Sequence, residues 1–214
     1  SFIGIIQRVS KAYDDKVKPH INKEKKVREV ISAFSKKIND MISDHIKYMD
    51  ITNSNTFATC YVGNNLDLPD TIKEKNIYLV ISHPPYLNSF NYSPIFSLEL
   101  YWGKVFEKNY SPLVSLYKEE MKAHPASESI TEQYFNHLRD CYTQTFNIQK
   151  NGDYLAVVIG DCTRKGELIP VLKNTQKIIE EIGYKTIMLN YRTTHYGLGK
   201  YAYKHRADYH DDIN

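Results

Sequence analysis

Two short apolar runs have the length and composition of buried β-strands. Residues 77–82 and 153–160 are rich in Ile, Val, Leu and Tyr, and near-continuous apolar runs are typical of strands covered on both faces of a parallel sheet. Two further strands are predicted at residues 57–63 and 184–191. Because these runs alternate with segments of helical periodicity, the pattern predicts a mostly parallel α/β sheet.

Apolar residues spaced three and four apart predict the helices. The longest helix is expected over residues 16–49, with Pro19 near its start and lysines on the face opposite the apolar stripe. Such a face is most often solvated, and its alternative uses are contact with nucleic acid or packing of the helix on another polypeptide. Further helices are predicted at residues 92–106, 105–129, 130–148 and from Pro170 to Ile182. Pro170 suits a first-turn position, and Gly183 suits a helix stop.

The strand at residues 77–82 runs directly into a double proline. Neither Pro84 nor Pro85 has an N–H, and each restricts the residue before it, so the backbone after His83 should leave the sheet in a stiff bend with free carbonyl groups. Ligands of open α/β sheets bind at the carboxyl ends of the strands, where this bend falls. The four residues by themselves also fit an ordinary proline-rich loop.

The side chains of this bend suit chemistry on an exocyclic amine. The amine of cytosine or adenine is a poor nucleophile because its lone pair is delocalised into the ring. Two acceptors aimed at its N–H groups, the His83 side chain and the Pro84 carbonyl, would favour the geometry in which that lone pair is available. Tyr86 offers a flat face on which an extruded base could stack, although core packing is the default role of a single tyrosine.

The longer stretch His83-Pro-Pro-Tyr-Leu-Asn-Ser-Phe-Asn-Tyr92, followed by Leu98-Glu-Leu-Tyr-Trp-Gly103, resembles the catalytic loop of the amino-methylating DNA methyltransferases. That family places Asp, Asn or Ser before Pro-Pro-Tyr, and its Ser-type members often continue with Leu-Asn-Ser, an aromatic residue and a Leu-Glu-Leu-Trp-like helix. This chain departs from the family at His83. The resemblance implies that His83, Pro84, Pro85 and Tyr86 are catalytic.

A later segment resembles the same family, so that the likeness extends over roughly residues 57–195. There a strand meets a loop, here Gly160-Asp161-Cys162, before a helix that starts at Ile169-Pro170. The resemblance implies S-adenosylmethionine as cofactor. It also implies cofactor contacts by four residues, Gly63, Asn64, Asn65 and Ser82. In the family an acidic or amide side chain after a glycine touches the adenine of the cofactor, whereas a turn formed for local backbone reasons is the alternative here.

One part of the family's cofactor site is missing from the sequence. No Phe-x-Gly-x-Gly loop occurs, and such a loop must let backbone approach the ligand closely, which side chains elsewhere cannot readily replace. Three explanations are open: the chain is the later part of a longer enzyme, a second polypeptide or upstream segment supplies the loop, or the cofactor site is defective. The chain begins at Ser1 and not at Met, which suggests that an upstream piece was removed.

The predicted partner of the chain is DNA. The stretch from Lys185 to Arg206 contains basic residues interleaved with tyrosines and no Asp or Glu, and cations with flat rings are typical of nucleic-acid surfaces. A solvated hairpin and loop is the alternative. The residues predicted to contact nucleic acid are Asn88, Tyr92, Arg192, Lys200, Lys204 and Arg206.

Composition adds a few constraints. The net charge of +3 over 214 residues is too small to indicate a partner by itself. Three cysteines without Cys-x-x-Cys spacing favour neither a disulfide framework nor a zinc site, so no metal is predicted. We expect a reduced, cytoplasmic location, since no run reaches the roughly 18 to 20 apolar residues of a membrane span and no signal peptide is visible.

Together these patterns predict a Rossmann-like methyltransferase fold that is incomplete if the missing loop lies elsewhere. The expected organisation is a helical segment at residues 1–50, a catalytic domain with the target-base half at residues 51–195, and a basic, tyrosine-rich segment at residues 196–214. The predicted function is methylation of DNA in a restriction-modification system, with cytosine N4 favoured over adenine N6 as the target. The alternatives are an RNA or tRNA methyltransferase and a catalytically silent subunit that binds DNA or a partner. The recognition sequence and oligomeric state cannot be inferred from the sequence.

Overall fold

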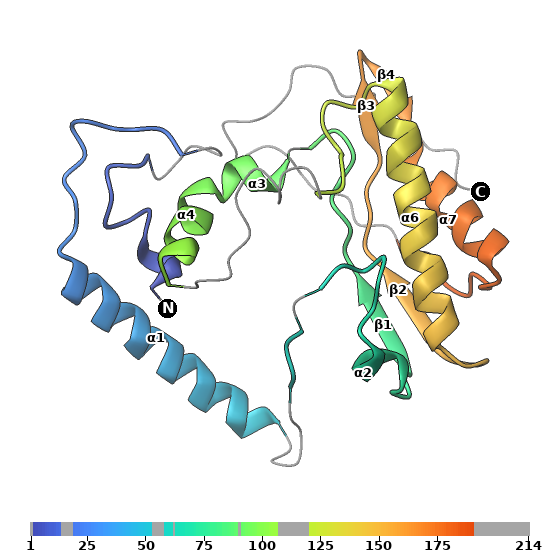
Figure 1. Cartoon of the computed structure of the whole chain (residues 1–214), viewed down its shortest axis with the longest axis horizontal. Helices are drawn as coiled ribbons and strands as arrows, with labels where there is room; N and C mark the ends of the chain where they lie inside the picture. The colour runs from blue at the N-terminus through green and yellow to red at the C-terminus, as the bar shows by residue number, and fades with distance from the viewer. Residues whose placement is uncertain are drawn as a thin grey trace. The chain divides into compact units, whose positions relative to one another are not determined.

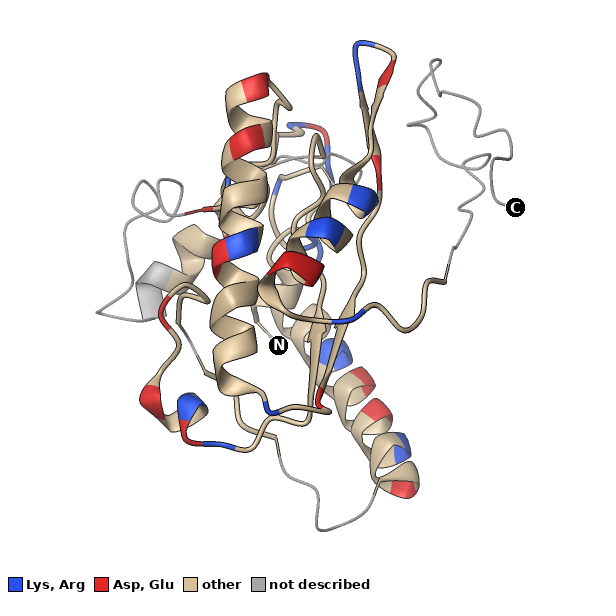
Figure 2. Cartoon of the chain, turned by 90° about the vertical axis from the view of Figure 1, so that its right-hand side faces the viewer, with Lys and Arg blue, Asp and Glu red and all other residues tan. Residues whose placement is uncertain are grey.

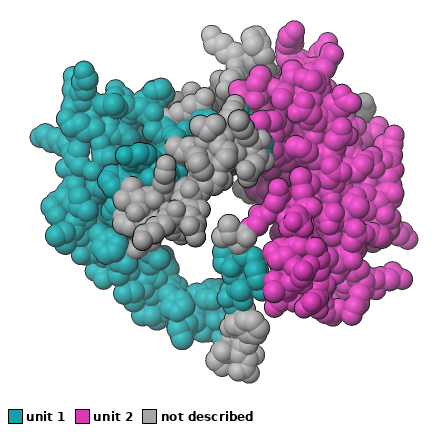
Figure 3. All heavy atoms as spheres, viewed as in Figure 1, with its two compact units in different colours: residues 1–61, 91–120 teal, residues 62–90, 121–214 magenta. Residues whose placement is uncertain are grey.

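The computed structural model of the chain describes residues 2–13, 19–52, 58–61, 63–89, 91–106 and 120–190. The chain forms two compact units, one from residues 1–61 and 91–120 and the other from residues 62–90 and 121–214 (Figure 3). The elements in chain order are η1 (Ile3–Ile5), α1 (Val30–Ile51), α2 (Asp70–Lys73), β1 (Leu79–Ser82), α3 (Tyr92–Ile95), α4 (Ser97–Phe106), α6 (Glu128–Ile148), β2 (Tyr154–Val157), β3 (Cys162–Arg164), β4 (Glu167–Ile169) and α7 (Val171–Ile182) (Figure 1). The predicted mixture of helices and parallel strands is confirmed at this level, while a complete Rossmann fold stays a prediction.

The first unit is built around the short 3-10 helix η1, which contacts both α1 and α4. Ile5 and Ile6 are almost fully buried there, and the ring of Phe2 meets the ring of Trp102 edge to face at 6.1 Å. The predicted helix over residues 92–106 is present as α3 and α4, separated at Phe96.

Helix α1 begins at Val30, so the predicted start near residue 16 is wrong. The side chain of Glu29 accepts hydrogen bonds from the backbone N–H groups of Ile31, at 2.8 Å, and Ser32, at 2.5 Å. These two bonds lower the pKa of Glu29 and satisfy donors that a helix start leaves unpaired. Residues before the cap are used differently, since Ile21 forms an antiparallel bridge with Ala12.

The second unit contains the predicted parallel strands. β1 and β2 pair in parallel, with Leu79 opposite Tyr154 and Ser82 opposite Val157. Helix α6 provides the core through Tyr134, Leu138 and Tyr142, which lie on one face at four-residue spacing and are buried. The core residues of this unit are Leu87, Ala123, Ala126, Tyr134, Leu138, Tyr142 and Val171, and Leu155, Val157 and Ile159 pack against them.

The other face of the β1–β2 pair is exposed, so the prediction of strands buried on both faces is wrong. Ile81 is 72% exposed, and Leu79, Tyr154 and Val158 are exposed as well. Burial therefore alternates along both strands, because the second layer that normally covers a parallel sheet is absent from the described residues.

Two predicted strands do not form. Residues 58–61 and 184–190 are in neither strand nor helix, and residues 57, 62 and 191 of the predicted runs lie outside the described residues. Thr186 instead donates a hydrogen bond to Glu180 of α7 at 2.6 Å. An apolar run becomes a strand only where it pairs with another strand, and in the described residues neither run pairs with the open outer edges of the two-stranded β1–β2 sheet.

The end of the predicted helix over residues 105–129 is also wrong. Residues 120–127 are not helical, and residues 107–119 lie outside the described residues. The reason is the cap of the next helix: the Ser127 hydroxyl accepts from the N–H of Ile130 at 3.2 Å, which places α6 from Glu128 onward. The predicted helix at residues 130–148 is thereby confirmed with two more residues at its start.

The predicted limits of α7 are confirmed. Pro170 immediately precedes the helix and Gly183 follows it with a φ of 127°. The Asp161 carboxylate accepts from the N–H of Leu172 at 2.7 Å. Between Asp161 and Pro170 the chain forms the β3–β4 hairpin, whose turn residues Lys165 and Gly166 both have positive φ, as a tight two-residue hairpin turn requires.

We expect Gly183→Ala to destabilise the second unit. A Cβ at Gly183 would lie 2.8 Å from Cζ of Phe146, and φ is 127°. Gly152→Ala is the matched control, since Gly152 has a φ of 96° but nothing within 4 Å of the added Cβ. In urea unfolding, Gly152→Ala should lose about 1 kcal/mol of unfolding free energy from backbone strain, and Gly183→Ala roughly 1 to 3 kcal/mol more from overpacking. Equal losses would show that Phe146 moves aside freely.

Candidate functional site

The His83-Pro-Pro-Tyr86 turn stands at the carboxyl end of β1, as predicted. The Nε2 atom of His83 lies 2.8 Å from the hydroxyl oxygen of Tyr86, and the two rings meet edge to face with centroids 5.1 Å apart. Both side chains are exposed, Tyr86 by 38%. A histidine and an aromatic face are therefore presented together to solvent.

Two tyrosines of α6 hold the ends of this turn. The hydroxyl of Tyr134 donates to the carbonyl of Pro85 at 2.7 Å, and the hydroxyl of Tyr142 lies 3.2 Å from Oγ of Ser82. Both rings are buried, and burial raises the pKa of Tyr142 while the Ser82 bond opposes the rise. The Tyr142 phenol therefore stays protonated at neutral pH, and the two hydroxyls tie the turn to the helix on both sides of His83.

Asn88 clamps the chain that leaves the turn. Its backbone is in the left-handed region, with a φ of 61°, and its N–H donates to the carbonyl of Ala123 at 2.6 Å. The side-chain amide donates to the carbonyl of Thr163 at 2.8 Å and accepts from the N–H of Ala126 at 3.1 Å. One residue thus links the turn to the segment before α6 and to β3, which makes Asn88 a positioning residue. Its predicted contact with nucleic acid stays a prediction.

Two of the four residues predicted to bind the cofactor, Asn65 and Ser82, contact neighbouring residues of α6. Asn65 forms a side-chain hydrogen bond with the thiol of Cys141; burial raises the pKa of that thiol and the Asn65 bond partly offsets the rise. Since Ser82 contacts the next residue, Tyr142, the structure brings Asn65 and Ser82 to the same part of one helix. Beside them lies a shallow hollow of about 260 Å³ lined by Leu66, Asp140, Thr143 and Gln144.

Gly63 and Asn64 form part of the exposed turn that carries Asn65. Asn64 forms an isolated antiparallel β-bridge with Asp67. The side-chain oxygen of Asn64, which was predicted to accept from the adenine amine of the cofactor, accepts from the N–H of Leu66 at 3.0 Å. This bond is the local backbone use of an asparagine that was the alternative interpretation. An oxygen has a second lone pair, so a further donor can still reach it.

Tyr92 belongs to the first unit and Asn88 to the second. The N–H of Tyr92 and the hydroxyl of Ser93 donate to the carboxylate of Glu120, the latter at 2.7 Å. The Tyr92 ring stacks on Phe96 with a centroid distance of 6.3 Å and is partly exposed. The Glu120 carboxylate therefore occupies the hydrogen-bond donors at the start of α3, so these donors are not available to an anionic group of a ligand.

Arg192, Lys200, Lys204 and Arg206 lie outside the described residues. Within the described ranges, no group of three or more His, Cys, Asp or Glu side chains is arranged to hold a metal ion. Burial raises the pKa of Cys162 to about 11, so this thiol is poorly suited to act as a nucleophile. None of the described helices combines the length and the apolar character needed to cross a membrane.

No protein-family model, curated protein or solved structure matches the chain. Functional inference therefore rests on the residues of the turn and their surroundings. The sequence interpretation missed the parts played by Tyr134 and Tyr142, although a signal was present: both lie on the apolar stripe of α6, and a buried tyrosine hydroxyl needs a partner.

We expect Asn88→Ala to destabilise the turn more than Asn88→Gly. Both variants lose two side-chain hydrogen bonds, worth roughly 0.5 to 1.5 kcal/mol each, but alanine also pays about 1 kcal/mol for left-handed backbone that glycine adopts freely. Urea unfolding of both variants measures the difference, which should be near 1 kcal/mol in favour of glycine. Equal stability of the parent and Asn88→Ala would show that the side-chain hydrogen bonds of Asn88 do not hold the turn in place.

Proposed function

We propose that the His83–Tyr86 turn binds the exocyclic amine of a base flipped out of duplex DNA, and that the chain is the target-base part of an S-adenosylmethionine-dependent DNA amino-methyltransferase. The observation that carries the proposal is the exposed His83–Tyr86 pair on a turn held at the end of a parallel strand. Enzymes that modify a base inside a duplex need a surface on which the extruded base stacks beside groups that read its edge.

The acceptors for the amine are the Pro84 carbonyl and one ring nitrogen of His83. Among the described residues no donor is bonded to the Pro84 carbonyl, whereas the Pro85 carbonyl is taken by Tyr134. If Nε2–H of His83 donates to the oxygen of Tyr86, the lone pair of Nδ1 is left to accept from the amine. This tautomer is the one the proposal requires, and Tyr86 stabilises it by accepting.

Two acceptors at the amine N–H groups free the nitrogen lone pair for attack on a methyl electrophile, a preorganised electrostatic contribution to the transition state. S-adenosylmethionine supplies that electrophile when bound. In this proposal Gly63, Asn64, Asn65 and Ser82 line one edge of its site, which fits the convergence of Asn65 and Ser82 on α6.

A second polypeptide or an upstream segment supplies the glycine-rich loop in this proposal. The exposed face of the β1–β2 pair supports it, because Leu79, Ile81, Tyr154 and Val158 form an uncharged surface of the kind that a covering helix buries. The chain alone should then bind S-adenosylmethionine weakly.

Cytosine N4 is the favoured target over adenine N6, since the residues after the turn resemble the Ser-type sequence, and restriction-modification is the proposed setting. An RNA or tRNA methyltransferase is a less favoured alternative because of the Leu-Asn-Ser-aromatic continuation. A catalytically silent DNA-binding subunit is the alternative that one observation favours: the Asn64 oxygen already accepts a local hydrogen bond.

Binding to duplex DNA that contains a mismatched cytosine tests the proposal. A mismatched cytosine costs less to flip than a paired one, so fluorescence anisotropy should show tighter binding to a mismatched duplex than to the same duplex fully paired. Tyr86→Ala should weaken mismatch binding by about 5- to 150-fold, corresponding to roughly 1 to 3 kcal/mol of stacking. Tyr86→Phe keeps the ring and should retain the preference.

The melting temperature distinguishes a binding role of Tyr86 from a structural one. Because the ring is 38% exposed, Tyr86→Ala should melt close to the parent. Unchanged mismatch binding together with a large fall in melting temperature would place Tyr86 in the core and sink the stacking role. If the parent protein binds paired and mismatched duplexes equally, the proposal that it binds a flipped base is wrong.

The acceptor role of His83 predicts a pH-dependent preference for amine-bearing bases. An imidazolium has no acceptor, so protonation of the His83 ring removes its ability to accept from the amine. The ratio of affinities for mismatched cytosine and for an analogue without the amine should therefore fall as the solution is made acidic enough to protonate the ring. Using the ratio cancels the general gain in DNA affinity that an added positive charge brings.

His83→Asn is the matched variant, because its amide oxygen accepts a hydrogen bond in neutral and in acidic solution alike. It should keep the amine preference at the acidic end, where the parent loses it. The same pH dependence in parent and variant would exclude His83 as the acceptor and leave Pro84 with an unidentified partner.

A further inference from the structure

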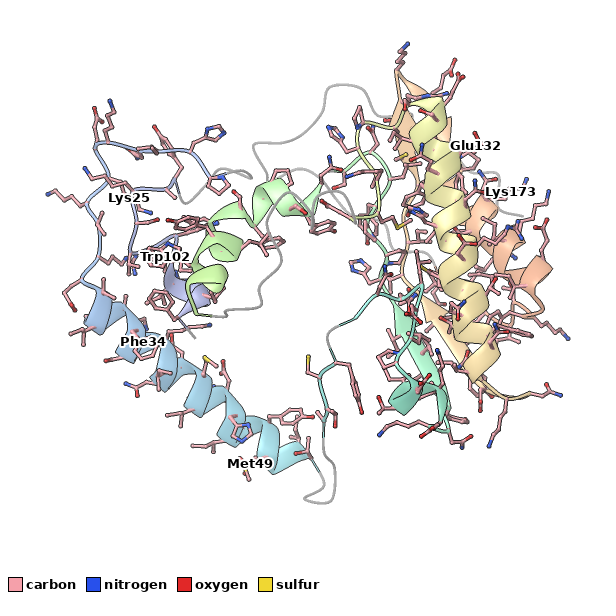
Figure 4. The ribbon with its side chains drawn as sticks, viewed as in Figure 1. Lys25, Phe34, Met49, Trp102, Glu132 and Lys173 are labelled. Atoms are coloured by element: carbon pink, nitrogen blue, oxygen red, sulfur yellow. The ribbon has the colours of Figure 1, made fainter. Side chains whose placement is uncertain are left out.

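Helix α1 carries an apolar stripe that nothing in the described structure buries. None of its residues is buried, and Ile31, Ile42 and Met49 are 73%, 53% and 61% exposed. Figure 4 shows the side chains of Phe34 and Met49 toward the two ends of the helix. Large exposed apolar patches on soluble proteins mark surfaces that bind another molecule.

The charges of α1 are segregated from this stripe in a heptad pattern. In a frame with Ser35, Ile42 and Met49 at position a and with Ile31, Ile38 and His45 at position d, every charged residue falls at b, c or f. These charged residues are Lys36, Lys37, Asp40, Asp44, Lys47 and Asp50. They also pair along their own helix, Lys36 with Asp40 at 3.6 Å and Lys47 with Asp44 at 3.4 Å. Figure 2 shows residues of both charge signs along this helix.

The contact of α1 with η1 leaves most of the a and d positions accessible. Three residues of α1 are half-buried: Ala33 and Lys37 lie at f and c, and Ile38 lies at d. The side chain of Lys37 lies beside Gly4 of η1, 3.4 Å from where a Cβ on that glycine would stand. Within the first unit, η1 thus uses the charged side of α1 more than the apolar stripe.

We propose that α1 pairs with α1 of a second copy of this chain, in antiparallel orientation about a two-fold axis level with residue 40. Residues equally far from that level then face each other, because 38 + 42 and 31 + 49 both equal 80. Ile38 packs on Ile42 of the partner subunit, and Ile31 packs on Met49 of the partner subunit. Ser35 faces His45 of the partner subunit and forms the polar layer that sets the register.

A second copy fits this surface better than other occupants. Nucleic acid would require cations, but no charged residue occupies the a, d, e or g positions of α1. The stripe matches itself under a two-fold axis, which is the commonest symmetry of soluble oligomers. Antiparallel pairing also aligns the helix dipoles favourably. In a parallel pair His45 would face His45 of the partner subunit, and antiparallel pairing avoids this contact.

This inference does not depend on the proposed function, because it rests on α1 alone. Analytical ultracentrifugation of the full chain, up to about 100 µM, should show a monomer–dimer equilibrium. Ile42→Asp places an unpaired charge in the interface and should raise the dissociation constant by about 100-fold or more. Ser43→Asp adds the same charge one residue away, at position b, and should leave the dissociation constant unchanged. Met49→Asp is a second interface variant in case Ile42→Asp does not fold, which circular dichroism checks.

A cross-linking experiment tests the orientation. In a Cys60→Ser background, Met41→Cys places two thiols near the two-fold axis of the antiparallel pair, so a short bifunctional maleimide should link the subunits. Ile31→Cys should not be linked, because each residue 31 then faces residue 49; in a parallel pair this result is reversed. The Cys60→Ser parent, whose remaining thiols are partly buried, must give no linked dimer.

The outcomes divide cleanly. Loss of the dimer in Ile42→Asp but not in Ser43→Asp, with cross-linking only through Met41→Cys, supports the antiparallel α1 pair. A monomer at every concentration overturns it, and so does equal behaviour of the Ile42→Asp and Ser43→Asp variants. Cross-linking through Ile31→Cys alone overturns the antiparallel arrangement.

Discussion

Two buried phenols of one helix fix the geometry of the candidate site. Tyr134 and Tyr142 lie on the face of α6 that forms the core, and their hydroxyls have no access to bulk water, so each must find a partner inside the protein. Tyr134 finds the carbonyl of Pro85, and Tyr142 finds the hydroxyl of Ser82. The same burial that stabilises α6 on the sheet therefore positions His83 between two fixed points. A proline-rich loop without these bonds would have the same sequence pattern and no defined place for its side chains.

The parts of the fold that were predictable are those whose partners lie within the described chain. β1, β2, α6 and α7 follow from periodicity, and Gly183 ends α7 because a left-handed residue is needed there. The predicted strand at 184–191 was wrong for a different reason. Its apolar residues indicate a segment suited to a sheet, but a sequence pattern does not state whether the segment reaches one of the open edges that a two-stranded sheet leaves. The start of α1 was missed because lysine-rich residues before Glu29 are as compatible with a helix as with the bridge that Ile21 forms.

The sequence indicated the candidate turn, but it did not indicate which groups the neighbouring asparagine amides bind. Asn64 and Asn88 were both assigned to ligands, since an asparagine can accept and donate. In the structure Asn64 accepts from its own turn, and Asn88 links three segments. Short polar side chains in loops have backbone groups within reach at every position, and only the fold decides which of them are met. The partners of Asn88 are 35 to 75 residues away in the chain, so no local pattern could have revealed them.

The departure at His83 makes sense only together with Tyr86. An aspartate, asparagine or serine before the double proline carries an oxygen that accepts without further arrangement, whereas a neutral imidazole accepts at one nitrogen and donates at the other. A neighbouring group must therefore determine which of the two ring nitrogens carries the proton. The hydroxyl of Tyr86 lies 2.8 Å from Nε2 and can accept from it, which leaves Nδ1 as the acceptor. In the proposed function Tyr86 thus has two separable roles, a ring face for the base and an oxygen for the histidine. A histidine in this place with phenylalanine at position 86 would retain the first and lose the second, so under this proposal the pairing of these two residues lets an imidazole replace an oxygen acceptor.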